Sequence, residues 1–354
     1  MKTLKKICNH VFIDGLSGMA QGLFATLIIG TILQQIGLAI GGTWGSYIQL
    51  IGKVAAACTS AGIGIGVAHK YGESSLVTVS AGVAAMVGGY ASAIMSGAVL
   101  SEGSIILTGP GEPLGAFVAA FVGITVGHLL SGKTKVDIII TPLATICSGA
   151  VVGLIAGPPI TALMTGLGDI VNWGTEQQPF LMGIIVSVMM GIILTLPISS
   201  AALGIILNLK GIAAGAAVIG CCCNMVGFAV ASYRENKVGG LLAQGVGTSM
   251  LQVPNIMRHP QIWLPAIVSS AILGPVGTML VNMQCNATGS GMGSAGFVGQ
   301  IMTYQTMIAY SDPATVIFKI VMMQFVLPAI ISLGVSELMR KKGWIKQGQM
   351  ALEL

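Results

Sequence analysis

The sequence contains little charge and few aromatic residues. Charged residues make up 8% of the 354 positions and aromatic residues 5%, whereas charged residues make up about 25% of an ordinary soluble domain. Hydrophobic residues account for 54%, and the mean hydropathy is +0.89. This composition excludes a water-soluble globular fold and predicts a protein that is solvated mainly by the lipid bilayer.

Sequence motifs for metal binding, catalysis and nucleotide binding are also missing. The seven cysteines lie mostly within apolar stretches, without metal-ligand spacing or histidine partners, so we interpret them as packing residues. Because no nucleophile is paired with a base and no phosphate-binding loop is evident, we expect no catalytic residue, cofactor or metal. The net charge of +5 is scattered over several joins, which favours lipid headgroups over nucleic acid as its partner.

Apolar windows long enough to cross a membrane recur along the whole chain. A spanning helix needs about 20 mostly apolar residues. The windows are 19–40, 47–68, 76–100, 113–130, 136–157, 180–208, 211–231, 238–257, 261–283 and 313–338.

Lysine and arginine mark one side of the membrane. They gather in residues 2–6, 133–135, 234–237 and 340–346, and such clusters identify cytoplasmic loops. We therefore expect a multi-pass membrane protein, with both termini cytoplasmic and no cleavable signal peptide.

Two of the apolar windows cannot form plain spanning helices. Pro197 interrupts the window 180–208, while Pro254, Pro260 and polar residues interrupt the run from 238 to 265. Irregular backbone at membrane depth survives only where protein or a water-filled cavity surrounds it. We therefore predict an all-α polytopic fold with about eight full transmembrane helices and two re-entrant hairpin elements.

The interrupted windows also supply the candidate binding residues. Amides and hydroxyls offer neutral donors and acceptors to a polar cargo, and transporters commonly bind cargo at broken helices. The alternative is a purely structural role, in which these side chains hydrogen-bond to backbone groups that the prolines leave unpaired or form hydrogen bonds between helices. The candidates are Thr195, Ser199, Ser200, Asn224, Gln244, Thr248, Ser249, Gln252 and Asn255.

The first half of the sequence has regular apolar spans, and the second half contains the interrupted ones. We expect residues 1–157 to form a scaffold and dimerisation region and residues 158–354 to form the transport region of one integral membrane domain. Glu112 is a further candidate, although it could simply stabilise the start of the helix that begins at residue 113. The glycine-rich stretch 284–300 is either a flexible outer cover or a second loop facing the cargo.

Several stretches of the second half resemble a known family. Leu196 to Gly204 (LPISSAALG), Gly247 to Asn255 (GTSMLQVPN), and the stretch from His259-Pro260 to Pro265 are similar to the integral membrane IIC components of the phosphoenolpyruvate-dependent sugar phosphotransferase system. The similarity is greatest to the type 2 branch that includes perfringolysin O regulator-like proteins, and there it spans essentially the whole chain.

This resemblance implies a homodimer that binds a sugar beside two hairpins and presents it to a phosphorylated IIB partner, itself charged by a IIA protein. The chain would then be at most one subunit of a phosphotransferase complex. One departure is that Gly247 and Thr248 stand where IIC components of the lactose and cellobiose type have a glutamate followed by proline. A membrane-embedded sensor that regulates a cytoplasmic partner without transport therefore stays open as the alternative.

Overall fold

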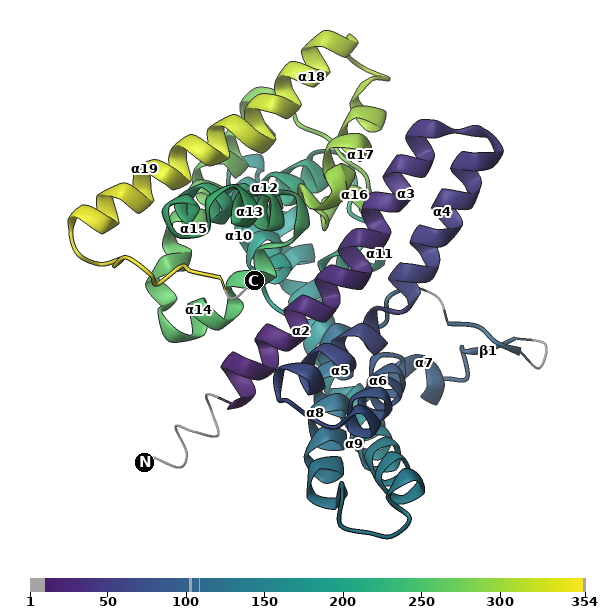
Figure 1. Cartoon of the computed structure of the whole chain (residues 1–354). Helices are drawn as coiled ribbons and strands as arrows, with labels where there is room; N and C mark the ends of the chain where they lie inside the picture. The colour runs from purple at the N-terminus through teal and green to yellow at the C-terminus, as the bar shows by residue number, and fades with distance from the viewer. Residues whose placement is uncertain (1–9, 102–103, 108, 353–354) are drawn as a thin grey trace. The chain divides into compact units, whose positions relative to one another are not determined.

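The computed structural model describes residues 10–101, 104–107 and 109–352, which fold almost entirely into helices (Figure 1). The chain separates into two compact units, Met1–Met164 and Thr165–Leu354. The basic segment expected at residues 2–6 lies outside the described residues. The expectation of an all-helical membrane fold is confirmed.

Six helical segments of the described chain are long and apolar enough to cross a membrane, and a bent pair adds a seventh. The pair consists of α4 and α5, which meet at an angle of 53°. The six are Leu16–Ile40, Pro113–Leu130, Asp137–Ile160, Gly211–Ala231, Pro260–Val281 and Pro313–Lys341. The finer count of about eight spans with two re-entrant elements stays a prediction.

The first unit is built from helices that pack through small residues. Figure 1 shows α3 and α4 as a hairpin, in which Gly30 and Gly37 lie against the backbone of Gly52 and Gly45. Such close approach is typical of helices in lipid, where packing replaces hydrophobic exclusion. The elements are η1 (His10–Gly15), α2 (Leu16–Leu23), η2 (Phe24–Ile28), α3 (Ile29–Ile40), α4 (Gly42–Ala57), α5 (Thr59–Lys70), α6 (Ser75–Gly89), α7 (Ala91–Met95), the antiparallel strands β1 (Leu100–Ser101) and β2 (Ser104–Ile105), α8 (Pro113–Leu130) and most of α9 (Asp137–Thr175).

The second unit surrounds one helix, α12, which is buried along almost its whole length. Its neighbours include several short, irregular elements, some of them π-helical or 3₁₀-helical (η). The elements are α10 (Pro179–Thr195), α11 (Ser200–Ile206), α12 (Gly211–Ala231), α13 (Tyr233–Leu242), η3 (Ala243–Gly247), η4 (Ser249–Gln252), α14 (Val253–Arg258), η5 (Pro260–Trp263), α15 (Leu264–Pro275), η6 (Val276–Val281), α16 (Ala287–Ser290), η7 (Ala295–Phe297), α17 (Val298–Met307), α18 (Pro313–Val321), η8 (Met322–Val326) and α19 (Leu327–Lys341).

Both interruptions predicted from proline are present. Helix α10 ends at Thr195, Leu196 is extended with ψ 159°, and α11 starts only at Ser200. The run from Tyr233 to Trp263 breaks into α13, η3, η4, α14 and η5, with extended backbone at Thr248 and non-helical backbone at His259. These breaks place short polar elements against the buried helix α12.

Glycines allow α10, α12 and α15 to approach one another closely. A Cβ atom at Gly220 of α12 would overlap the carbonyl of Ser187 in α10, and a Cβ atom at Gly274 of α15 would overlap that of Gly183. The hydroxyl of Ser187 donates to the carbonyl of Ser270 in α15 over 2.8 Å. Any larger side chain at Gly220 would therefore force α10 away from α12.

We predict that Gly220→Val lowers the free energy of unfolding by about 2–4 kcal/mol, because the added methyls overpack a contact made of backbone atoms. Denaturant titration of the purified protein in mixed micelles would measure the change. The matched control is Gly334→Val, since Gly334 is exposed on α19 and has open space around its Cα. Equal stability of the two variants would contradict the prediction.

Candidate functional site

The ends of the two interrupted segments meet at a pair of hydroxyls. Thr195, the last residue of α10, lies 2.8 Å from Ser249, the first residue of η4, measured between their side-chain oxygens. Both residues are fully buried. A polar contact between two helix breaks is therefore enclosed within the second unit.

Asn224 on the buried helix α12 connects this hydroxyl pair to α15. Its side-chain oxygen accepts from the Trp263 indole N–H over 2.8 Å and from the Thr195 hydroxyl over 3.2 Å. Its amide nitrogen donates to the carbonyl of Gly220 over 3.1 Å and to the hydroxyl of Ser270 over 3.4 Å. We call Thr195, Asn224, Ser249, Trp263 and Ser270 the asparagine cluster.

A second group of buried side chains extends from the far end of η4. Gln252 donates to the side-chain oxygen of Gln244 over 2.9 Å, and Asn255 donates to that of Gln252 over 2.9 Å. The amide nitrogen of Gln244 in turn donates to the hydroxyl of Ser232 over 2.9 Å. We call Gln244, Gln252 and Asn255 the amide row.

The remaining predicted residues have more local roles in this structure. Thr248 caps η4 by accepting from the Met250 N–H over 3.1 Å. The hydroxyl of Ser200 donates to the carbonyl of Gly291 over 2.6 Å, and Ser199 is half-buried beside it at the start of α11. Glu112 belongs to the first unit, where its backbone N–H donates to Gly89 immediately before α8.

The glycine-rich stretch 284–300 packs inside the second unit. Besides Ser200, it meets the middle of α12, because a Cβ atom at Gly293 would crowd Cys221 and Cys222, and the carbonyl of Ser290 lies 3.6 Å from the Cys221 sulfur. Positive φ angles at Gly293 and Gly296 permit the tight path. This packing argues against a loose cover, and the cargo-facing role of the stretch stays a prediction.

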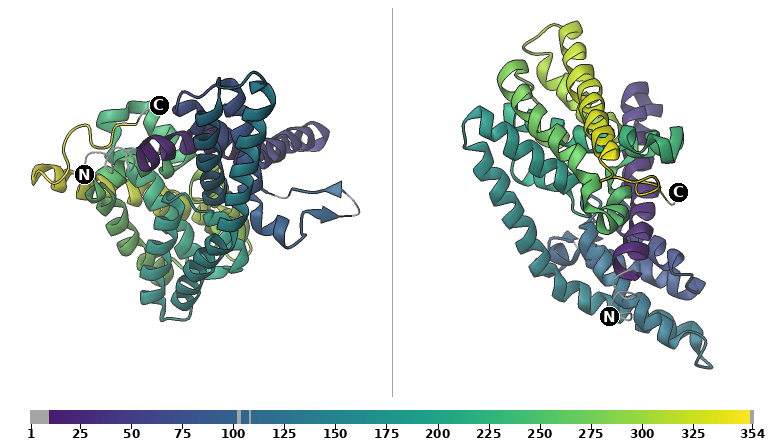
Figure 2. Two further views of the ribbon diagram at one scale, coloured as in Figure 1. Left: turned by 90° about the horizontal axis from the view of Figure 1, so that it is seen from below. Right: turned by 90° about the vertical axis from the view of Figure 1, so that its left-hand side faces the viewer.

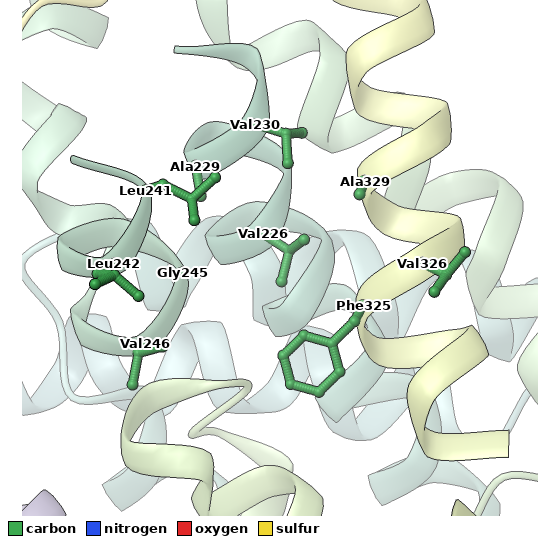
Figure 3. Close-up of a pocket in the computed structure, with 10 residues that line it drawn as sticks. All are labelled: Val226, Ala229, Val230, Leu241, Leu242, Gly245, Val246, Phe325, Val326 and Ala329. Atoms are coloured by element: carbon green, nitrogen blue, oxygen red, sulfur yellow. The ribbon is translucent and has the colours of Figure 1, made fainter. Parts of the chain in front are cut away.

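A cavity of about 320 Å³ lies on another part of the second unit (Figure 3). None of the predicted site residues lines it, and every side chain in its wall is apolar. A sugar placed there would lose its hydrogen bonds with water without replacement. The lining residues are Val226, Ala229, Val230, Leu241, Leu242, Gly245, Val246, Phe325, Val326 and Ala329.

The described residues of the asparagine cluster and the amide row are all uncharged at neutral pH. Ion pairing occurs instead at the edge of the unit, where Arg340 and Glu235 lie 3.0 Å apart with both side chains buried. Neutral donors and acceptors suit a hydroxyl-bearing ligand, whereas an ion would require a compensating charge.

Sequence reasoning missed two members of the asparagine cluster, Trp263 and Ser270. Trp263 was visible only as part of an apolar stretch, although an indole N–H in a membrane segment needs an acceptor and could have been paired with Asn224. Ser270 gave no signal of its own. Serine is common at close helix contacts, and nothing in the sequence joins it to residues 46 positions away.

Residues 13–352, which include both groups of polar residues, match the family described as "Phosphotransferase system, EIIC". The chain belongs to this family. It is therefore a multi-pass membrane protein and a permease component of the phosphotransferase type. A search of the curated proteins finds no match to the chain.

We predict that Asn224→Leu destabilises this EIIC protein by about 2–4 kcal/mol, because it leaves the indole N–H of half-buried Trp263 and the hydroxyl of buried Thr195 without their shared acceptor. Unfolding in mixed micelles, followed by circular dichroism, would measure the stability. Gln178→Leu is the control, since Gln178 is exposed and its side chain does not cap α10. A variant as stable as the control would show that the cluster contributes little to the fold.

Proposed function

We propose that this EIIC protein binds a small neutral sugar or polyol at the junction of its two interrupted segments and translocates it. The observation that carries the proposal is the contact between Thr195 and Ser249 at the point where two helices break. Thr195 also bonds to Asn224 of α12. Broken helices meeting at a buried polar contact are the usual construction of transporter sites. Sugar binding also fits the family and the uncharged character of the cluster.

The proposed ligand residues divide into two sets. Thr195, Asn224 and Ser249 form the inner set, and Gln244, Gln252 and Asn255 form the outer set beside η4. Each amide offers one acceptor and two donor hydrogens, which is the combination that a ring of sugar hydroxyls requires. Ser199, Ser200 and Thr248 would contribute from the flanks of the same breaks. Glu112, which belongs to the first unit, is proposed as a separate ligand candidate.

A membrane arrangement follows from this proposal. The seven span-length segments would be supplemented by the shorter apolar helix α6, giving about eight full crossings, while α10 with the turn at Pro197 and the segment around Pro254 would dip in and return. Residues 1–157 would form the scaffold and dimer interface, and residues 158–354 the transport region. Both termini would face the cytoplasm of a bacterial cell, where IIB and IIA phospho-carriers would act.

The second candidate function is a membrane-embedded sensor that regulates a partner without transport. Two observations favour it: the hydrogen-bonding groups of the amide row already have partners within the chain, and Gly247 and Thr248 replace the glutamate-proline pair of the lactose and cellobiose type. A sensor needs a ligand-dependent change of shape but no path through the membrane.

We predict that one or more members of a panel of mono- and disaccharides and polyols raise the unfolding temperature of the purified protein, because a ligand of the folded state stabilises it. Ser249→Ala should weaken the affinity for that sugar by about 5- to 10-fold through the loss of one hydrogen bond. Ser46→Ala, on exposed helix α4 of the first unit, is the matched control.

Uptake into vesicles with and without a phosphorylated IIB protein separates the candidates. Uptake that requires the phosphorylated partner supports the permease, and binding without uptake supports the sensor. Uptake at the same rate without the phosphate donor would refute the phosphotransferase mechanism, and a panel with no stabilising sugar would refute sugar binding.

A further inference from the structure

The chain turns back after α19 and lies along the outer set of proposed ligand residues. Figure 1 shows this segment, in yellow, as an extended trace that leaves α19 and ends beside α14. Figure 2 shows the same course from two other directions. The reversal begins at Gly343, whose φ of 73° favours glycine. We call residues 346–352 the C-terminal strap.

Side-chain amides hold the strap through its backbone. Gln252 donates to the carbonyl of Met350 over 3.0 Å, and Asn255 donates to the carbonyl of Ala351 over 2.8 Å. Asn236 of α13 forms two hydrogen bonds with the same stretch: it donates to the carbonyl of Met350 over 2.8 Å and accepts from the Leu352 N–H over 2.8 Å. The strap is therefore bound in the way that a peptide ligand would be.

These contacts use up the donors of the amide row. The side-chain nitrogen of Gln252 has two hydrogens, of which one goes to Gln244 and the other to the strap. Asn255 divides its two hydrogens in the same way between Gln252 and the strap. A sugar hydroxyl oxygen could accept from either amide only if the strap carbonyl left first.

The strap has mostly exposed side chains, and it is also held by a 3.4 Å bond from the Gly348 N–H to Glu235 and a 3.3 Å contact between Gln349 and His259. Its backbone forms neither helix nor strand, Lys346, Gln347 and Ala351 are exposed, and only Met350 is fully buried. The preceding segment is anchored by buried Ile345 and by the Arg340–Glu235 ion pair at the end of α19. Segments with few buried contacts open locally at low free-energy cost. Release would therefore begin within the strap and stop near residue 345.

We propose that the C-terminal strap is an internal competitor of the ligand. When bound, the strap satisfies Gln252 and Asn255 and closes the outer part of the site; when it leaves, each amide offers one donor to a ligand hydroxyl. This inference rests on the proposed function, because it assigns regulation to the same site. By linkage, the ligand favours strap release to the same extent that strap release favours ligand binding.

The competing explanation is that the strap only completes the core around Met350. That side chain packs with Phe228, Ile256 and Met339. In that case, loosening the strap would lower stability and leave ligand affinity unchanged. The two explanations differ in affinity and in the response of the strap to ligand, so a stability measurement alone cannot separate them.

The decisive variant is Asn236→Ala, which removes two strap contacts without changing any proposed ligand residue. Using the panel sugar that most stabilises the wild-type protein, we expect roughly 10-fold tighter binding to this variant. Hydrogen exchange of residues 346–352 should be faster in the variant, and adding the sugar to the wild-type protein should accelerate it there too. Gln347→Ala, an exposed amide replacement within the strap, should bind and exchange like the wild type.

A chain truncated after Ile345 is the second test, although the loss of buried Met350 will lower its unfolding temperature. If the truncated protein folds, it should bind the sugar at least as tightly as Asn236→Ala. Faster strap exchange in Asn236→Ala with unchanged affinity would overturn the competitor proposal and leave the proposed function intact. If no panel sugar binds the wild type, Asn236→Ala or the truncated chain, the proposed function itself fails and the competitor proposal fails with it.

Discussion

The second unit depends on the side-chain amide of Asn224, which is fully buried on α12 and joins α10, η5 and α15 through hydrogen bonds. In a low-dielectric interior an unpaired amide is costly, so the elements around it must keep their register or leave polar atoms unbonded. Glycine makes the arrangement feasible, because Gly220 and Gly274 bring the three helices close enough for these short side chains to reach one another. The helix breaks at Thr195 and Ser249 then lie beside Asn224, so polar side chains are available to hydrogen-bond where the helices end.

The sequence was sufficient to locate the breaks in the second unit. Proline lacks an N–H and disfavours a helical conformation in the residue before it, so Pro197 predicted the end of α10 near residue 195. The density of polar residues and prolines between 244 and 260 likewise predicted that no single helix would form there. Polar residues at these breaks were also the right place to look for buried hydrogen bonds, since Thr195 meets Ser249.

The partners of those residues could not be predicted from the sequence. The amide row was expected to face cargo, and in this structure its members Gln252 and Asn255 bind backbone carbonyls almost 100 positions further along the chain. Backbone carbonyls are identical at every residue, so no pattern marks Met350 or Ala351 as their partners. For the same reason the packing of Ser200 against Gly291 gave no advance signal. Contacts of this kind depend on tertiary geometry and not on local preference.

The π-helical turn η8 has a consequence for the orientation of α19. It lies between α18 and α19 inside one span-length segment, and a π turn contains one residue more than an α turn. If the same residues formed a regular α-helix, the extra residue would rotate α19 by about 100° relative to α18. Ser332, which faces Gly227 of α12, would then swing out toward lipid. The π turn therefore keeps the face of α19 that contacts α12 in register with α18.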